Sequence, residues 1–156
     1  DLPDFAKLRI EEKELNYTIE KLGAAAFSNA EEGRNDSLSK ALQLYKEFEY
    51  QKAKLSLLQI VNDYPDDQMA QLYLGLSYLQ NSEYAKAAKY LSPLTRAEGF
   101  EYKNTAKWYA VWCFAKFNTE HDLATARALL KELAEDPIFE FSEYARAYLD
   151  LFEKRK

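Results

Sequence analysis

Few residues in this chain have the types and spacing that catalysis or metal binding requires. The single histidine, His121, lies in a polar stretch, and no second histidine or cysteine stands at metal-ligand spacing from it. The single cysteine, Cys113, follows Trp112 in an apolar stretch without a neighbouring base, which is typical of a small buried hydrophobic residue. These residues therefore predict no catalytic, cofactor-binding or metal-binding site.

Two pairs of adjacent carboxylates could in principle act as acid and base. Glu31 and Glu32 form one pair, and Asp66 and Asp67 form the other. Both pairs stand where loops are expected, so we interpret them as solvated ends of helices. The chain also has no glycine-rich phosphate loop, no G-x-S-x-G and no H-E-x-x-H. We expect a protein that is not an enzyme and needs no cofactor.

Composition favours one all-helical globular domain. The chain has 156 residues, of which 47% are hydrophobic, with only four glycines and four prolines and no long alternating Val/Ile/Thr run. The net charge is −5, and no basic stripe is present to neutralise phosphates, which disfavours a nucleic-acid partner. No apolar run approaches the roughly 20 residues that span a bilayer, so no direct membrane insertion is expected.

A fixed period of about 34 residues relates two stretches of the chain, and such a period indicates stacked repeats. It superposes small residues on small ones and large apolar residues on each other, in the pairs Ala41/Gly75, Leu44/Tyr78, Tyr50/Tyr84, Ala53/Ala87 and Leu57/Leu91. Gly75 costs about 1 kcal/mol of helix propensity relative to alanine, and we expect that cost to be offset by the close approach of Ala87 on the paired helix.

This pattern resembles the tetratricopeptide repeat (TPR), a helix-turn-helix unit with the same period. The matching residues are Leu74, Gly75, Tyr78, Tyr84, Ala87 and Leu91 in one repeat and Ala41, Tyr50, Ala53, Leu57 and Pro65 in the repeat before it. The resemblance implies an all-α fold in which the repeats form a right-handed superhelical stack with a C-terminal capping helix. It places TPR 1 at 34–67 and TPR 2 at 68–101, and it says little about a ligand.

A third, degenerate repeat is expected over 102–138. In its second helix Ala126 takes the role of Ala87. Ala126 follows Ala87 by 39 residues, however, which is five more than the period of 34. If Val111 takes the small-residue site, two of the five extra residues fall in the preceding loop and three in the turn around 118–122. The alternative register places Trp112 at that site and would overpack the contact between the helices, so we favour Val111.

Both ends of the chain are also expected to be helical. Apolar residues recur at helical spacing over 139–156, with Ser142 as the N-cap, and predict a helix that caps the last repeat. These residues are Phe141, Tyr144, Ala145, Tyr148, Leu149 and Phe152. Residues 1–33 do not fit the period: we expect a first helix up to Gly23, with Phe5 and Leu8 on its apolar face, and then an irregular connection over 24–33. That helix could pack on the stack, pair with another copy, or lead to an anchor.

Pro93 interrupts the second helix of TPR 2. Proline has no N–H group and crowds the carbonyl four residues earlier, at Lys89. We expect this helix to bend near 89–90 or to stop early.

The resemblance also implies a binding surface, because TPR ligands commonly lie along an inner face lined by the first helices. The positions that fall there are Leu38, Leu42, Tyr45, Met69, Leu72, Leu76, Leu79, Gln80, Trp108, Trp112 and Lys116. Tyr and Trp dominate binding energy when a partner excludes water from them. An apolar groove of this kind would suit an amphipathic helix or an extended apolar segment of a protein or peptide. The alternative is that these side chains are core, buried by the N-terminal helix or by neighbouring first helices.

Two hypotheses for function remain. The first is a TPR scaffold for protein–protein interaction, and the second is a structural module that forms a homo-oligomer through an apolar surface or its N-terminal helix. TPR proteins that clamp C-terminal carboxylates use Asn and Lys or Arg on the inner face. This chain has leucine at the matching positions, so it is not expected to bind such tails.

The last three predicted helices, from Trp108 onward, also resemble the C-terminal end of bacterial TPR proteins carried behind a membrane anchor. The chain begins at Asp1 without a methionine, which suggests a processed product. A removed signal or anchor favours an extracytoplasmic, periplasmic location over the cytoplasm.

Overall fold

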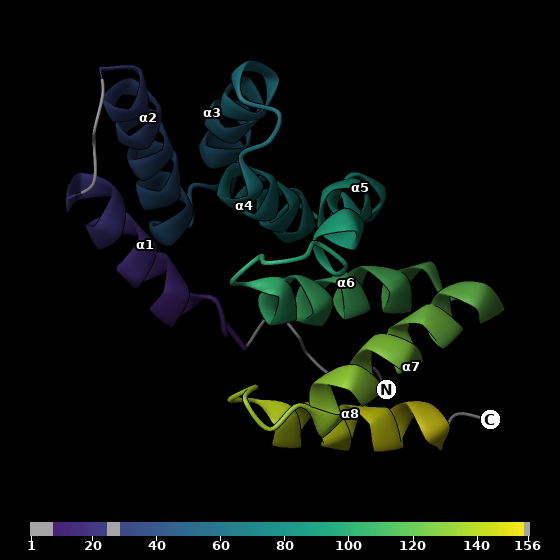
Figure 1. Cartoon of the computed structure of the whole chain (residues 1–156). Coiled ribbons are helices and arrows are strands. Elements are labelled where there is room, and N and C mark those ends of the chain that lie inside the picture. The colour runs from purple at the N-terminus through teal and green to yellow at the C-terminus, as the bar shows by residue number, and fades with distance from the viewer. Residues whose placement is uncertain (1–7, 25–28, 155–156) are drawn as a thin grey trace. The chain divides into compact units, whose positions relative to one another are not determined.

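The structure, a computed structural model, describes residues 8–24 and 29–154. All secondary structure in these residues is helical (Figure 1), which confirms the prediction of an all-α chain for this part. The helices are α1 (Glu12–Ala24), α2 (Asn29–Lys46), α3 (Tyr50–Asp63), α4 (Gln68–Gln80), α5 (Tyr84–Leu94), α6 (Lys103–Phe117), α7 (Glu120–Glu135) and α8 (Ser142–Glu153).

Two compact units make up the chain. The N-terminal unit comprises Glu11–Tyr90, and the C-terminal unit comprises Leu91–Lys156 together with Asp1–Ile10. The division falls inside α5, three residues before Pro93. Consecutive helices fall, with small offsets, at the ranges predicted for the repeats: α2 and α3 at 34–67, α4 and α5 at 68–101, and α6 and α7 at 102–138.

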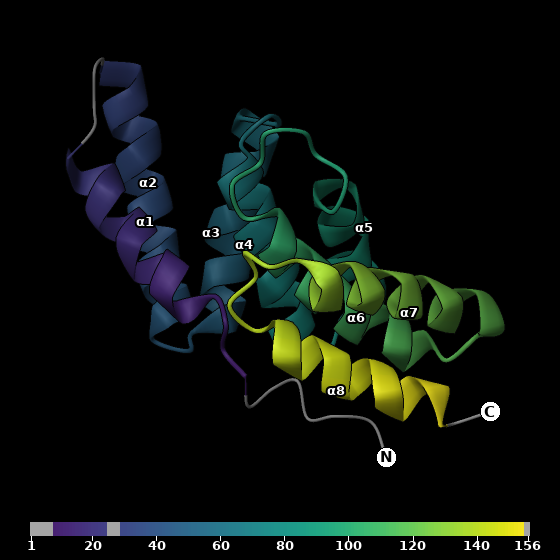
Figure 2. The ribbon, with the colours of Figure 1, turned by 60° about the horizontal axis from the view of Figure 1, so that its bottom comes forward.

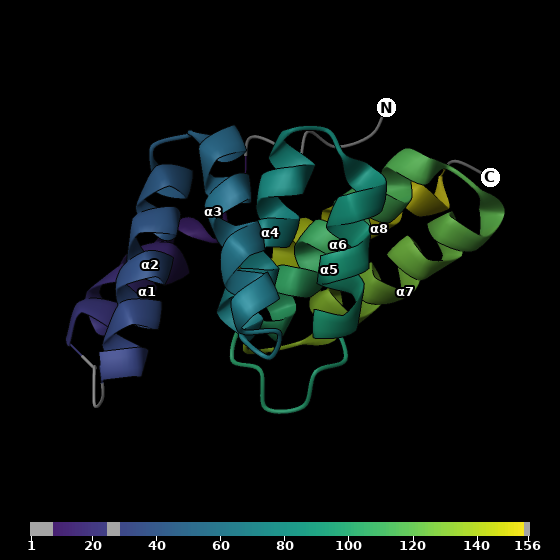
Figure 3. The same ribbon diagram turned by 90° about the horizontal axis from the view of Figure 1, so that it is seen from above.

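Helices of the N-terminal unit pack in sequence order. Contacts join α1 to α2, α2 to α3, and α3 to α4, and Figure 3 shows α2, α3 and α4 following one another. The buried side of α2 carries Leu38, Leu42 and Tyr45, spaced by four and three residues as an amphipathic helix requires. The contact between α1 and α2 confirms the interpretation in which the first helix packs on its own domain.

The N-terminal boundary differs from the prediction in two ways. The first helix begins only at Glu12, and Phe5 of its predicted apolar face lies outside the described residues. The irregular connection predicted over 24–33 is wrong from residue 29 onward, because α2 begins at Asn29 and Gly33 lies inside it. Residues 30–32 are Ala-Glu-Glu, all good helix formers, and one glycine costs too little to stop such a helix.

The turns of the first two hairpins share a pair of backbone hydrogen bonds and stand one sequence period apart. In each, the second residue before the following helix has a left-handed backbone, and two backbone N–H groups bond back to the end of the first helix. The bonded pairs, donor first, are Phe48–Tyr45 (3.0 Å), Glu49–Leu44 (2.9 Å), Ser82–Leu79 (2.9 Å) and Glu83–Tyr78 (2.9 Å). Phe48 and Ser82 are the left-handed residues, with φ of 64° and 61°. The sequence period is thus also a period of backbone geometry.

The third hairpin has a shorter turn. Only Asn118 and Thr119 separate α6 from α7, so the prediction that three extra residues lengthen this turn is wrong. Asn118 is left-handed (φ 58°), a conformation that asparagine tolerates. Thr119 then caps α7 directly, because its hydroxyl accepts the N–H of Asp122 at 3.1 Å.

The extra residues lie within α7 instead. Val111 precedes the left-handed Asn118 by seven residues, as Gly75 precedes Ser82, which agrees with the register predicted for α6. Ala126 is fully buried, but it stands eight residues after Asn118, whereas Ala87 stands five after Ser82. The small residue of the third hairpin is therefore nearly one helical turn further along its helix.

The two remaining predictions concern Pro93 and the C-terminal helix. Helix α3 ends at Asp63, and one sequence period later the equivalent position is residue 97. Helix α5 ends three residues before that position, at Leu94, which confirms the prediction that it stops early.

Helix α8 packs on α7 and covers the last hairpin (Figure 2), as a cap does. Its N-cap is Phe141 and no side chain caps it, so the prediction of Ser142 as the N-cap is wrong.

Candidate functional site

The side chains predicted to form an inner groove are mostly buried. Those on α2 (Leu38, Leu42 and Tyr45) are at most 2% exposed, and five of the eight on α4 and α6 are buried as well. The other buried members are Leu72, Leu76, Leu79, Trp108 and Trp112. Met69 and Gln80, at the two ends of α4, are half-buried, and Lys116 near the end of α6 is exposed.

Tyr45 shows how this burial is achieved in the N-terminal unit. Its ring makes edge contacts with the rings of Tyr50 on α3 and Tyr73 on α4, at centroid distances of 5.1 and 5.2 Å. Its hydroxyl donates a hydrogen bond to Oε1 of Glu11, at 3.1 Å, and the Glu11 side chain is itself fully buried. A buried carboxylate needs such a donor, so Tyr45 holds the chain segment that leads into α1.

Trp108 shows the same kind of burial in the C-terminal unit. Its indole stacks on Tyr148 of α8, with ring centroids 5.3 Å apart and planes 29° apart, and lies 6.2 Å from the ring of Phe139. Both neighbours come from the segment after α7. The C-terminal helix therefore buries the aromatic residue that the groove prediction offered to a partner.

Eight of the eleven predicted groove residues are thus core side chains in this structure. This burial fits the interpretation in which the chain itself covers the first helices. It does not fit an open apolar groove formed by these eight side chains. Only Met69, Gln80 and Lys116 offer a partner direct access. Their role in partner binding stays a prediction.

His121 and Cys113, the single histidine and the single cysteine, lie in contrasting environments. His121 is exposed near the start of α7. Cys113 is fully buried in α6, and this desolvation raises the pKa of its thiol to about 12, so the nucleophilic thiolate is scarcely populated at neutral pH. Among the described residues, no three His, Cys, Asp or Glu side chains come together in a group that could hold a metal ion.

Asp67 has a structural role that the sequence interpretation missed. Its carboxylate accepts the N–H of Ala70 at 3.0 Å and so caps the N-terminus of α4. The signal was present in the sequence, because aspartate directly before an apolar helical run is a common N-cap. Oδ2 of Asp67 also lies 3.9 Å from Nε of Arg34 on α2. This ion pair links the first helices of two successive hairpins.

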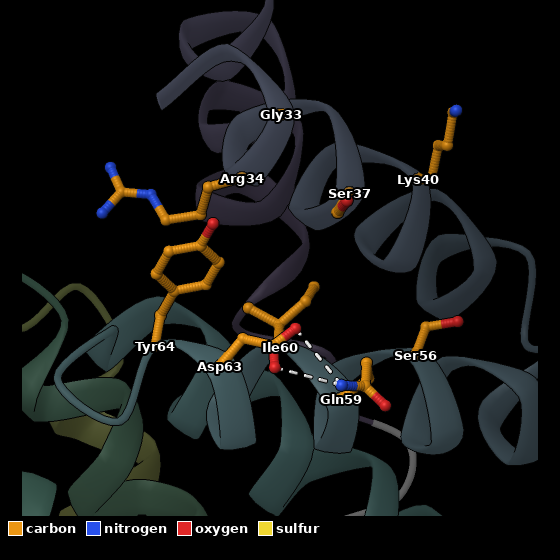
Figure 4. Close-up of a pocket in the computed structure, with 9 residues that line it drawn as sticks. All are labelled: Gly33, Arg34, Ser37, Lys40, Ser56, Gln59, Ile60, Asp63 and Tyr64. Atoms are coloured by element: carbon orange, nitrogen blue, oxygen red, sulfur yellow. Dashed lines mark hydrogen bonds between the residues drawn. The ribbon is translucent and has the colours of Figure 1, made fainter. Parts of the chain in front are cut away.

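A cleft of about 580 Å³ lies between α2 and α3 (Figure 4). Arg34 extends over the ring of Tyr64, with its guanidinium carbon 5.9 Å from the ring centroid. Further along α3, the Gln59 amide donates to both carboxylate oxygens of Asp63 at 3.2 Å. The lining mixes cations, anions and hydroxyls, so it could accept a polar side chain but selects no ligand charge. Periodicity could not reveal this cleft, because its residues come from the polar sides of two helices.

None of the helices in the described residues is both long and apolar enough to cross a bilayer. No protein-family model matches the chain, and searches of curated proteins and of solved structures return no match. The likeness to TPR proteins therefore rests on the residues and the repeated turns described above.

Proposed function

We propose that this chain is a non-enzymatic scaffold for protein–protein interaction, built from TPR-like hairpins in a right-handed superhelical stack. The observation that carries this proposal is the repeated turn: two successive hairpins, one sequence period apart, have the same backbone hydrogen bonds and a left-handed residue at the same place. Repeats of this kind present an extended, regular surface to a partner rather than an enclosed site. A binding role is the use that fits such a surface.

The side chains of the first helices suggest an apolar or amphipathic segment as the partner. Among the predicted groove residues on these helices, those that remain accessible are Met69 and Gln80 on α4 and Lys116 on α6. Methionine is a flexible apolar contact residue, and the other two supply a hydrogen-bonding group and a charge at the margin. A partner that also reached Tyr45 or Trp108 would have to displace the segment before α1 or the helix α8.

Site-specific photocrosslinking tests the proposal. A photoreactive amino acid is introduced at position 69, 80 or 116, on the first helices, and the intact protein is irradiated in its native host. The matched controls carry the same amino acid at Lys52, Lys89 or Lys131, which are exposed on the second helices α3, α5 and α7.

We expect one discrete protein adduct at the first-helix positions and none at the controls. Adducts confined to the second helices would place the partner on the opposite faces of the hairpins. The absence of any adduct at all six positions would argue against a scaffold.

The second candidate function is a self-associating module. One specific observation favours it: α8 carries large apolar side chains that remain exposed, among them Tyr144 and Leu151. Self-association and partner binding are compatible, because these residues lie outside the set predicted for the groove.

A further inference from the structure

Three lysine side chains gather around two stacked tyrosine rings in the N-terminal unit. The rings of Tyr78 on α4 and Tyr90 on α5, neighbouring helices in Figure 3, have centroids 5.8 Å apart and planes only 10° apart. The ammonium nitrogens of Lys54 and Lys86 lie 5.5 and 5.6 Å from the centroid of Tyr78. That of Lys89 lies 5.5 Å from the centroid of Tyr90, and cations at such distances are attracted to the rings. We call these five residues the lysine–tyrosine cluster.

The cluster has an excess of positive charge. Among the described residues, the carboxylate that pairs with its lysines is Glu83, which lies 3.0 Å from Nζ of Lys54 and 3.5 Å from Nζ of Lys86. Lys89 forms no ion pair in the described part of the chain. Three ammonium groups thus share one carboxylate, although the chain as a whole has a net charge of −5. Solvent screens the Lys54 charge only in part, since its side chain is 13% exposed.

The repeat accounts for only part of this cluster. One period before Glu83 and Lys86, Glu49 and Lys52 form the same kind of pair at 4.0 Å, so this pair belongs to the repeated hairpin. The two rings and the third ammonium group are absent from the first hairpin, whose residues at those positions are Leu44, Leu55 and Ser56. The cluster is therefore an addition to one hairpin that the packing of the repeat does not require.

The lysines of the cluster are arranged against the stability of their helix. Lys86 and Lys89 are both exposed and stand three residues apart on α5, and like charges at this spacing destabilise a helix. Lys54 reaches the same carboxylate from α3 and adds a third positive charge. Negative charge supplied from outside the chain would offset this repulsion.

We propose that the lysine–tyrosine cluster binds an acidic segment of a partner protein, in which two or more Asp or Glu side chains lie close together. The position of Glu83 shows the chemistry that these lysines accept, because its carboxylate already lies between two of them. The exposed ammonium groups of Lys86 and Lys89 are the donors for further carboxylates. The rings hold the lysine side chains in place, which lowers the entropy cost of binding.

Binding of an acidic segment is separable from binding on the first helices. Lys86 and Lys89 lie on the second helix α5, whereas the photocrosslinking positions 69, 80 and 116 lie on the first helices α4 and α6. At the control position 89, the photoreactive amino acid itself removes a charge on which the acidic segment depends. No adduct is therefore expected at that control, and either kind of binding can fail without the other.

Fluorescence anisotropy with a fluorescein-labelled hexaglutamate peptide tests the proposal on the intact chain. The protein is titrated up to about 1 mM, because exposed charge pairs are individually weak. The wild-type chain binds the peptide, and its affinity falls several-fold as the salt concentration rises from about 25 to about 150 mM. A labelled Gly-Ser peptide of the same length does not bind.

Two double variants locate the site. Lys86→Gln with Lys89→Gln removes two charges from the cluster and lowers the affinity for hexaglutamate about tenfold, as the loss of two exposed charge pairs predicts. The melting temperature of this variant does not fall, because glutamine is a good helix former and the like-charge repulsion is relieved. The matched control, Lys52→Gln with Lys131→Gln, changes the net charge equally at two exposed positions outside the cluster and leaves the affinity within about twofold.

Three results would overturn the proposal. The first is a wild-type chain that does not bind hexaglutamate at low salt. The second is an equal loss of affinity in the two double variants, which would trace the binding to net charge alone. The third is displacement of the peptide by millimolar inorganic phosphate at constant ionic strength, which would make the cluster a phosphate site.

Discussion

Gly33 lies inside α2, where a β-carbon would meet no atom within 4 Å. Gly99, in the loop before α6, has equally open surroundings, but its φ of +73° is a backbone conformation that other residues rarely adopt. The two glycines therefore differ only in backbone conformation. Alanine substitutions at the two positions therefore measure separately how helix propensity and left-handed backbone strain affect stability.

We predict opposite effects for the two alanine substitutions. Gly33→Ala should raise the free energy of unfolding by about 0.5–1 kcal/mol, because alanine favours the helix. Gly99→Ala should lower it by about 1–2 kcal/mol, because a β-carbon is strained at positive φ. Urea denaturation followed by circular dichroism measures both. Stabilisation by both substitutions, or by neither, would contradict the assigned backbone conformations.

At the scale of elements, an aromatic stack and a hydrogen bond both join the C-terminal helix to the last hairpin. Tyr148 of α8 lies on the buried Trp108 of α6, and the carbonyl of Ala134 near the end of α7 accepts a hydrogen bond from Nη2 of Arg146 at 3.0 Å. The stack contributes both buried area and the added attraction of paired rings. The hydrogen bond satisfies a terminal carbonyl of α7 that has no partner within its own helix.

We predict that Tyr148→Ala loosens α8 and leaves the first two hairpins intact. The expected cost is about 2–4 kcal/mol, within the range for removing a large aromatic side chain that is partly buried. Hydrogen exchange should show faster exchange of the α8 amides, with α2–α5 unchanged. Tyr144→Ala is the matched control on the same helix, because Tyr144 is half exposed and its loss should leave α8 protected in the monomer. Equal loss of protection in both variants would show that the stack does not hold the helix.

At the scale of the whole molecule, each unit contains a carboxylate whose pKa is lowered by its neighbours. In the N-terminal unit, a hydrogen bond from Nζ of Lys54, at 3.0 Å, lowers the pKa of Glu83 and joins α3 to the next hairpin. In the C-terminal unit, the Asn104 amide lowers the pKa of Asp136 through a hydrogen bond of 2.9 Å. A lowered pKa in the folded state means that the charged form stabilises the fold.

We predict that both units lose stability in acid. The contribution of each carboxylate is fully present above its unfolded-state pKa, near 4.5 for Glu83 and 3.8 for Asp136, and is lost as pH falls through the lowered folded value. Because both groups are close to solvent, each contributes no more than about 1 kcal/mol. Melting temperatures between about pH 7 and about pH 2 measure the effect. Glu83→Gln and Asp136→Asn should each flatten this dependence, and a steeper one in either variant would contradict the assignment.

The sequence by itself determined the helices and their period. Helix propensity and apolar spacing are properties of neighbouring residues, and the small residues Ala53 and Ala87 stand at equal distances from two equal turns. Pro93 likewise acts locally, because it removes one backbone hydrogen bond from the last turn of α5, which ends one residue later at Leu94. The turn before α7 was mispredicted because the spacing to Ala126 does not show whether extra residues enter the turn or the helix.

Only the tertiary structure decided what covers the first helices. An apolar stripe shows that a helix face must be buried, but it does not show whether the chain itself or a partner buries it. For Tyr45 the cover includes Glu11, and for Trp108 it includes Tyr148, each of which is distant in the sequence. These contacts depend on where the first and last helices fold back, so no local pattern could predict that most of the expected groove is core.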